Sequence, residues 1–419
     1  AVSLTDGFAV YIHLLFYMIS QIHLFNPGHE TAVLLGTENY TPPANVRRMI
    51  QELSYLPVWY ADSNDYVFTE EIASPRFFSL QPKELRPFAT LVSVKELKEL
   101  APSLPELAAS PWGISPHSLY VFEKLKQELQ LNLSVPTWKE EYFRLTGRQT
   151  AAECLERIRQ LLPDLPIPAT PKFCKKIREI EKYLILQNAP FVVKTPYSSS
   201  GRGLHWIPER KLTPKDRTWI EGAINKQGTV SIECGLDKVH DLAMEFYSDG
   251  KGHVTYEGLS VFSTEKKGSY SGNVLGSQEY LATPIKRWIG EDVYQRTQEA
   301  VTEALKSIYG NIYHGYLGVD MIVYKTKDGS YALHPCIEIN MRYTMGMVAL
   351  RLSQRYLAPH AIGDFHITYD SKAGDAYERH RFMKGAYPLT IENGKIREGY
   401  LSLCPVTKET KYRAYILVV

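Results

Sequence analysis

The residues best suited to chemistry lie in one segment, residues 318–342, which reads GVDMIVYKTKDGSYALHPCIEINMR. Its pattern predicts two strands joined by a tight turn at Asp328 and Gly329, because Asp-Gly favours the left-handed torsions of a hairpin. Side chains alternate between the two faces of a strand. We therefore expect one face of this hairpin to be buried, with these side chains on it: Val319, Met321, Val323, Tyr331, Leu333, Ile337 and Ile339.

The opposite face of the same hairpin collects polar groups, namely Asp320, His334, Glu338, Asn340 and Arg342. Two carboxylates and an amide oxygen form a hard oxygen site, which suits Mg²⁺ (or Mn²⁺) better than zinc. An arginine beside them suits a phosphate or a developing negative charge. The alternative is a solvated strand face with a surface ion pair, since Asp, Glu and Arg are usually exposed.

A second pattern, FVVKTPYSSSGRG, covers residues 191–203. An apolar strand leads to Lys194, and a loop of serines and glycines follows. Glycines let the backbone approach oxygen atoms closely, and serine hydroxyls add donors. With Lys194 and Arg202 supplying positive charge, the loop is typical of a polyphosphate cradle, although the Walker A pattern is absent. On its own, the loop fits a flexible connection between strands better.

A third pattern, TVSIECGLDKVHDLAMEFY, begins about thirty residues after the loop lysine. It predicts a strand that ends at Glu233, Cys234 and Gly235, with Asp241 a few residues later. These residues could offer backbone groups to a nucleotide base and a carboxylate to ribose hydroxyls. Alone, this pattern is weak, because acidic residues after a strand are usually solvated.

The composition sets limits on the class of protein. A chain of 419 residues is long enough for two or three packed units. A net charge of +2 gives no indication of nucleic acid or of an acidic membrane surface as partner. The cysteines form no CxxC pair, which favours a reducing cytoplasm and argues against disulfides or a thiolate zinc site; they are Cys154, Cys174, Cys234, Cys336 and Cys404.

The first residues form an apolar run, FAVYIHLLFYMI at residues 8–19. The run is too short for a membrane span, which needs about 20 apolar residues. No Lys or Arg precedes it and no small-residue cleavage site follows, so it makes a poor signal peptide; a signal peptide or membrane anchor is the alternative. We expect residues 1–17 to be an upstream extension and Met18 to be the biological start.

Alternating strands and helices then predict a small parallel α/β unit over residues 19–130. Its expected elements are a strand at residues 19–25, a helix over 41–53 with Thr41 as cap and Pro42 in its first turn, and strands at 56–61 and 89–94.

The segment NPGHE, residues 26–30, follows the first strand, at the sheet edge where open α/β sheets bind ligands. His29 and Glu30 are therefore candidate substrate contacts. A purely structural turn is at least as good an interpretation, because Asn-Pro-Gly is strong turn chemistry.

The rest of the chain predicts further helices and strands with no internal repeat. Expected helices cover residues 116–165 in large part (most clearly 150–162), 172–186 and 290–309. Expected strands cover 191–194, 204–207, 229–233 and 242–247, and a hairpin turn falls at residues 393–394.

The order of these patterns resembles the ATP-grasp superfamily, over about residues 146–346. The resemblance implies a mixed α/β and α+β architecture: an N-terminal parallel α/β domain, a small central α+β lid lobe and a C-terminal α+β lobe, with ATP held between the two lobes. The predicted bounds are 18–165 with a helical connector, 166–240 with the Gly/Ser loop, and 241–419 with the metal site. The N-terminal domain is similar to that of uncharacterised bacterial ATP-grasp proteins, and this similarity does not identify a substrate.

The resemblance also implies a role for each candidate residue. Lys194 would contact the α and β phosphates and, with Arg342, serve catalysis; Glu233 and its neighbours would meet adenine, and Asp241, where many members have Glu, would meet ribose. Mg²⁺ ions would be held by Asp320, Glu338 and Asn340. The predicted ATP-binding residues are Arg148, Lys194, Ser198, Ser199, Ser200, Gly201, Arg202, Gly203, Glu233, Cys234, Gly235 and Asp241.

One position departs from the family pattern. Members usually carry a further lysine before the loop lysine, just ahead of a helix, and here that place falls on Arg148. Arginine can clamp phosphate as well as lysine. Lys139 and Lys175 are the alternatives.

The resemblance implies an ADP-forming ligase, in which a carboxylate attacks Mg-ATP to give an acylphosphate and an amine (or a thiol) displaces phosphate. The partners would be a small-molecule or peptide carboxylate and an amine. The substrate contacts we expect, besides His29 and Glu30, are Tyr270, Asn273 and His334. Alternatives are a kinase acting on a hydroxyl and a nucleotide-binding regulatory protein without turnover.

Overall fold

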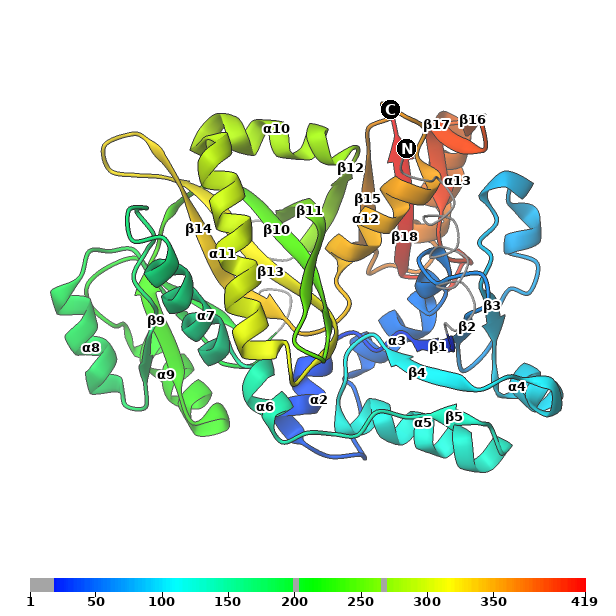
Figure 1. Ribbon diagram of the computed structural model, residues 1–419, viewed down its shortest axis with the longest axis horizontal. Coiled ribbons are helices and arrows are strands. Elements are labelled where there is room, and N and C mark those ends of the chain that lie inside the picture. The colour runs from blue at the N-terminus through cyan, green and yellow to red at the C-terminus, as the bar shows by residue number, and fades with distance from the viewer. Residues whose placement is uncertain (1–18, 199–202, 265–269) are drawn as a thin grey trace, which may run out of the picture.

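The computed structural model describes residues 19–198, 203–264 and 270–419, which form three β-sheets with helices packed against them (Figure 1). The predicted extension at residues 1–17 lies outside the described residues, as do Ser199, Ser200, Gly201 and Arg202 of the predicted phosphate loop. Within the described part of the chain, no helix has the length and apolar character needed to cross a membrane.

The first sheet is parallel, with strand order β3-β2-β1-β4-β5, so the predicted N-terminal parallel unit is confirmed. Ile22 on the central strand is fully buried against helices on the sheet. The elements are β1 (Ser20–Leu24), α2 (His29–Leu35), α3 (Ala44–Leu53), η1 (Leu56–Trp59), β2 (Tyr66–Phe68), η2 (Phe78–Leu80), η3 (Lys83–Leu85), β3 (Thr90–Val92), α4 (Val94–Leu100), η4 (Ala101–Ser103), β4 (Leu107–Pro111), α5 (Pro116–Leu129) and β5 (Leu133–Ser134).

The strand expected at residues 56–61 is wrong, because this segment forms the 3₁₀ helix η1. A short apolar run does not reveal whether its period is that of a strand or of a helix. Pro57 also lacks the N–H group that a strand ladder requires. The run is buried in either case, and Trp59 donates from Nε1 to the Leu403 carbonyl at 2.6 Å.

The helix expected from Thr41 begins later, at Ala44, with Pro43 as its N-cap. A proline disfavours helical torsions in the residue before it. Pro43 therefore excludes Pro42 from the first turn.

The second sheet has four antiparallel strands in the order β6-β9-β7-β8, and with α8 and α9 it encloses its own apolar core, at the left of Figure 1. The strands predicted at residues 191–194 and 204–207 are confirmed. The helix predicted over residues 172–186 begins only at Ile177, because the preceding residues pair with β9. The elements are β6 (Lys172–Cys174), α8 (Ile177–Leu186), β7 (Phe191–Lys194), β8 (Leu204–Ile207), α9 (Pro214–Gln227) and β9 (Val230–Cys234).

The third sheet is antiparallel and has the order β14-β13-β10-β11-β12-β15-β18-β17-β16. Its elements are β10 (Asp237–Asp249), β11 (Val254–Thr264), β12 (Tyr270–Leu275), α10 (Gln278–Ile289), α11 (Glu291–Tyr309), β13 (His314–Lys325), β14 (Tyr331–Asn340), α12 (Met345–Tyr356), β15 (Gly363–Tyr369), α13 (Asp375–Ala386), β16 (Thr390–Glu392), β17 (Lys395–Ser402) and β18 (Tyr412–Val418). The hairpin at residues 393–394 is confirmed by the pairing of β16 with β17.

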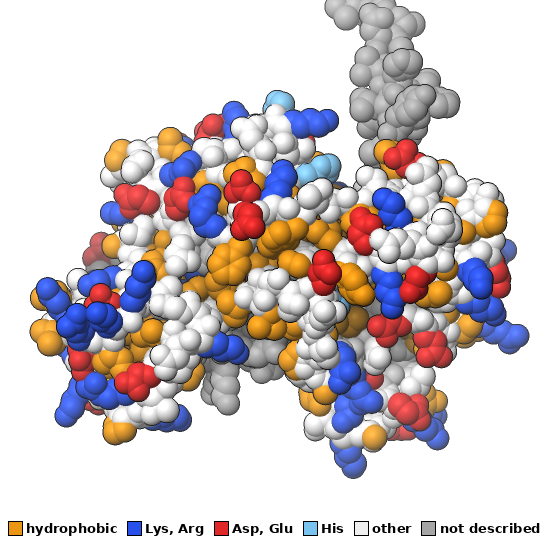
Figure 2. Space-filling view, turned by 90° about the horizontal axis from the view of Figure 1, so that it is seen from below, with side chains coloured by type: hydrophobic (Ala, Val, Ile, Leu, Met, Phe, Trp, Pro, Cys, Tyr) orange, Lys and Arg blue, Asp and Glu red, His pale blue; other side chains and the backbone are white. Residues whose placement is uncertain are grey.

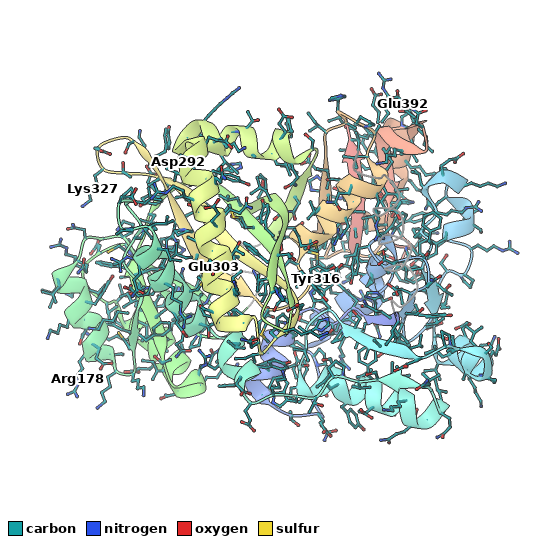
Figure 3. The ribbon with its side chains drawn as sticks, viewed as in Figure 1. Arg178, Asp292, Glu303, Tyr316, Lys327 and Glu392 are labelled. Atoms are coloured by element: carbon teal, nitrogen blue, oxygen red, sulfur yellow. The ribbon has the colours of Figure 1, made fainter. Side chains whose placement is uncertain are left out.

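Helices cover one face of strands β10 and β13 of this sheet, and the other face of these two strands lines the site. The connector helices are α6 (Glu141–Thr146) and α7 (Arg148–Leu161), which confirm the helical prediction for that region. With α10 and α11, α7 packs on the apolar face of β10 and β13. Asp292 and Glu303, labelled in Figure 3, mark the outer surface of α11. The alternate side chains of β10 and β13 therefore face the opposite direction.

The hairpin of β13 and β14 turns as predicted, with Gly329 at φ +88°. On β13 the apolar side chains are fully buried, as expected; they are Val319, Met321 and Val323.

Two apolar residues of β14 do not take their predicted places. Asp320 lies opposite Glu338 and Ile322 lies opposite His334, so residues 335–337 bulge opposite a single residue of β13. The bulge turns Ile337 into the wall of a cavity, which simple alternation does not predict. Tyr331, beside the turn and beyond the core, is 41% exposed.

Candidate active site

A cavity of about 1510 Å³ is lined by residues of the four-stranded and nine-stranded sheets and, from the N-terminal unit, by residues of α3 and of the loops that follow β1 and β4. Figure 2, seen from below, shows a notch between the lobe of the four-stranded sheet, on the left and rich in Lys and Arg, and the rest of the molecule. The sequence-based candidates that line the cavity are Arg148, Lys194, Glu233, Cys234, Gly235, Asp241, Tyr270, Asn273, Asp320, His334, Glu338, Asn340 and Arg342.

Arg148 begins α7 and lies at the junction between the loop after β7 and the hairpin. Its Nε donates to the Thr195 carbonyl at 3.1 Å and its Nη2 to Ser198 Oγ at 3.3 Å. The same Nη2 lies 3.0 Å from Glu338 Oε2. Arg148 is thus held between the start of the predicted phosphate loop and a predicted metal ligand.

The alternatives to Arg148 lie elsewhere. Lys139 Nζ donates to the Ile312 carbonyl at 2.7 Å, and neither Lys139 nor Lys175 lines the cavity. Gly203, at the far end of the loop, leaves no room for a side chain: a Cβ there would collide with Thr195 and Ser198. This close approach explains why the loop ends in glycine.

Lys194 ends β7, is only 8% exposed, and forms an ion pair with Glu233 on the neighbouring strand β9. Burial acts to raise the pKa of Glu233, but Lys194, His334 and Arg148 together outweigh it, and the pKa lies below its ordinary value. Burial lowers the pKa of His334 to about 4, so this histidine is neutral at pH 7. His334 lines the cavity, as predicted, beside this pair.

At the predicted base-binding end, Gly235 and Asp241 already have hydrogen-bond partners within the protein. The Gly235 N–H donates to the Pro190 carbonyl at 2.7 Å, so it is already engaged. A Cβ at Gly235 would press on Trp206 at 2.8 Å, which explains the glycine. Asp241 lines the cavity but accepts from Lys238 Nζ at 2.6 Å and from Thr264 Oγ1 at 2.9 Å.

The polar face of the hairpin brings together the predicted metal ligands. Asp320 and Glu338 are direct partners across the β13–β14 register, and Asn340 Nδ2 donates to Asp320 Oδ1 at 3.1 Å. Burial raises the pKa of Asp320, and the charges of Glu338 and Glu245 raise it further. This environment therefore disfavours the ionised form of Asp320.

Arg342 is held by three acceptors. Its Nε donates to Glu30 Oε1 at 2.7 Å, its Nη2 to Asn340 Oδ1 at 2.7 Å and its Nη1 to the Tyr343 carbonyl at 3.1 Å. Burial acts to raise the pKa of Glu30, but Arg342 and His29 together outweigh it and hold that pKa well below its ordinary value. The guanidinium is thus fixed in one orientation by a carboxylate from the N-terminal sheet unit.

Pro27 and Gly28 of the segment at residues 26–30 line the cavity, whereas His29 and Glu30 are buried beside it. The role of His29 and Glu30 as substrate contacts stays a prediction. Asn26 instead clamps Gly113 through both of its amide atoms, at 2.7 and 3.2 Å. The His29 ring packs where a Cβ of Gly113 would lie. Both interactions fix the turn from which Glu30 reaches Arg342.

Tyr270 and Asn273 line the cavity and contact each other, and their role as substrate contacts stays a prediction. The Tyr270 hydroxyl donates to Asn273 Oδ1 at 2.6 Å, and Asn273 Nδ2 donates to the Val261 carbonyl at 3.2 Å. Both side chains border the cavity.

One group in the cavity is not among the sequence-based candidates. Glu245 on β10 is 1% exposed and accepts from Thr344 Oγ1 at 2.8 Å and Ser260 Oγ at 3.0 Å. Burial raises its pKa to about 7, against the effect of these two hydroxyls. The only signal in the sequence is an acid between the apolar Met244 and Phe246, on the face that alternation assigns to the site.

Comparisons with known proteins find similarity in structure alone, since no family model and no curated protein matches the chain. The biotin carboxylase domain of Hydrogenobacter thermophilus 2-oxoglutarate carboxylase, solved with MgADP, ADP and bicarbonate, superposes with a TM-score of 0.51 at 14% identity, over 96% of this chain and 87% of that chain. A biotin carboxylase from Campylobacter jejuni gives 0.52 at 12% identity, over 95% and 87%. At such identity the likeness establishes the fold.

The packing around Glu245 predicts that Gly346→Ala destabilises the protein. A Cβ at Gly346 would collide with Glu245 and Ser260, at a buried position on α12. We expect a loss of about 1–3 kcal/mol in the free energy of unfolding, measured by urea denaturation. Gly385→Ala on α13, where a Cβ meets open space, is the matched control and should be neutral or slightly stabilising. Equal effects of the two substitutions would contradict this packing.

The pKa of Glu245 predicts a pH dependence of stability. Because its folded-state pKa of about 7 exceeds the ordinary 4.5, the folded protein binds more protons between these values. The free energy of unfolding therefore falls as pH rises through this window, by up to about 3 kcal/mol. Glu245→Gln, measured without metal, should lose less stability than the wild type from about pH 5 to about pH 8. Glu303→Gln on the outer surface of α11 is the control, and identical slopes in all three proteins would refute the assignment.

Proposed function

We propose that this chain, which has the ATP-grasp fold, is an ADP-forming ligase that joins a carboxylate to an amine (or a thiol) through an acylphosphate. The observation that carries the proposal is the convergence of three cations on one cavity beside a pair of carboxylates that face each other. The cations are Lys194, Arg148 and Arg342, and the carboxylates are Asp320 and Glu338.

In this proposal the nucleotide lies between the four-stranded and nine-stranded sheets. Lys194 and Arg148 bind the phosphates, beside Ser198 and Gly203 at the two ends of the predicted phosphate loop. The base lies against the end of β9 at Glu233, Cys234 and Gly235, and Asp241 binds the ribose. Phosphoryl transfer needs positioned positive charge and exclusion of water more than covalent help, and a cavity between lobes supplies both.

The polar face of the hairpin fits Mg²⁺. Asp320, Glu338 and Asn340 offer only oxygen ligands, and the crowding that raises the pKa of Asp320 is relieved by a divalent cation. Among the described residues no cluster of three or more His, Cys, Asp or Glu side chains could hold a metal ion. The third protein ligand in this proposal is Asn340 Oδ1, which also accepts from Arg342. When bound, Mg²⁺ neutralises phosphate charge.

The chain's own residues then serve the two chemical steps. A carboxylate oxygen attacks the γ-phosphorus and ADP departs; the amine attacks the acyl carbon, loses a proton and expels phosphate. Arg342, fixed by Glu30 and Asn340, stabilises the charge of the transferring group. We also propose a cytoplasmic location, since all five cysteines are free thiols.

The proposal is tested by assaying ADP and phosphate release over panels of carboxylates and amines. Release that requires both components, with hydroxylamine trapping of the acylphosphate, supports the ligase, and Lys194→Ala should abolish it by weakening ATP binding. A product that keeps the phosphoryl group would identify a kinase instead. ATP binding that no acceptor converts into turnover would identify a regulatory nucleotide-binding protein.

Glu338→Gln should separate nucleotide binding from turnover. The substitution removes a metal ligand, so we expect turnover to fall at least about a hundredfold. It also releases Arg148 from its ion pair at 3.0 Å, so the affinity for ATP without metal should be preserved or increased. Turnover follows from the coupled assay, and affinity from calorimetry in EDTA. Unchanged turnover would exclude Glu338 as a ligand.

Glu30→Gln should misplace Arg342 without touching the nucleotide. We expect kcat to fall about tenfold to a hundredfold while KM for ATP is little changed, because the loss affects the transition state. Glu52→Gln is the control: Glu52 accepts from the backbone of Lys411 and Tyr412 and does not line the cavity. An equal loss in both variants, or a rise in KM alone, would contradict a positioning role.

A further inference from the structure

We propose that the part of the cavity wall formed by β15, β18 and α13 is a binding subsite for an oxyanion group, a carboxylate or a phosphate, of the second substrate. The identification of the ligand as a substrate rests on the proposed function. The subsite itself is argued from four residues that line the cavity, Arg413, Thr368, Asp370 and Arg379.

Arg413 on β18 is 3% exposed and its Nε and Nη1 find no hydrogen-bond acceptor among the described residues. Asp370 Oδ2 lies 3.5 Å from Nε, within ion-pair range but outside hydrogen-bonding geometry, and it too lacks a donor. Leaving a buried donor unpaired costs about 1–3 kcal/mol. Native structures normally satisfy such groups with water or a ligand.

Thr368 supplies a third unpaired group at the same place. It is the partner of Arg413 in the β15–β18 register, so both side chains project from one face of the sheet. Its buried Oγ1 has no hydrogen-bond partner within the described ranges. A hydroxyl beside a guanidinium is a donor set that an oxyanion satisfies with several oxygens at once.

The charge of this wall is positive. Arg379 Nε on α13 lies 3.1 Å from Asp370 Oδ1, so Arg379 and Arg413 share a single carboxylate and one positive charge is left over. The Arg413 guanidinium lies 5.3 Å from the ring centroid of Tyr415, which fixes its plane. By contrast, the opposite end of the cavity is acidic, with Asp320, Glu338 and Glu245.

The position of the subsite bears on the kind of substrate. In the sheet, β18 is five strand positions from β13, the strand of Asp320, or roughly 24 Å along the sheet. The cavity of about 1510 Å³ exceeds the usual roughly 300–1,000 Å³ of a single small-molecule site, which leaves room beyond a nucleotide. We therefore infer an extended substrate that carries an anionic group remote from its reacting carboxylate.

The test measures anion binding to the full chain while the nucleotide site is filled with Mg²⁺ and adenylyl imidodiphosphate, which occupies the triphosphate positions. Inorganic phosphate and succinate are titrated separately at constant ionic strength, and the melting temperature is recorded. We expect it to rise with one of these probes, and the more effective probe identifies the group. Arg413→Met should raise the half-maximal anion concentration at least about tenfold. No response to either probe in the wild type would overturn the proposal.

Two further variants keep the result interpretable. Arg381→Met, on α13 but outside the cavity lining, should leave the anion response unchanged. If Arg413→Met does not fold, Thr368→Val, which removes the unpaired hydroxyl at nearly constant volume, should still weaken anion binding, and an unchanged response there would refute the subsite. Absence of a melting shift with the nucleotide analogue itself would count against the proposed function, whereas a nucleotide shift without an anion shift would count against the subsite alone.

Discussion

The constraint on which the site depends is that buried charges must be neutralised. Removing an ion from water costs several kcal/mol unless a partner of opposite charge and further hydrogen bonds compensate. In this cavity every cation proposed for catalysis has its own carboxylate, and the pairs are Lys194–Glu233, Arg148–Glu338 and Arg342–Glu30. The pair Arg342–Glu30 joins the nine-stranded sheet to the N-terminal unit, so it also helps to fix how these two units meet.

Much of this arrangement could be predicted from the sequence, because strand periodicity and turn chemistry are local. The alternation in residues 318–342 is enough to place Asp320 and Glu338 on one face, and the Asp-Gly turn sets their strands side by side. The order of the strand with Lys194, the acid-ended strand and this hairpin gave the fold, which the structural comparisons confirm.

What could not be predicted depends on contacts between distant segments. The bulge that exposes Ile337 to the cavity has no signature in the alternation of β14. The role of Glu30 requires a partner 312 positions away, and Glu245 depends on Gly346, whose missing side chain makes room for it. The apolar run at residues 56–61 is part of the core, but it is too short for its periodicity to distinguish a strand from a helix.

The pair of Arg148 and Glu338 has a consequence for how ligands enter. Arg148 is the proposed ligand of phosphate and Glu338 the proposed ligand of the divalent cation. In this structure the two side chains form an ion pair with each other. The ligand that binds first would break this ion pair, so the second ligand would bind without the free-energy cost of breaking it. With these two proposed roles, the binding of phosphate and of the cation would show positive heterotropic cooperativity, and thermodynamic reciprocity would make the gain the same in both directions.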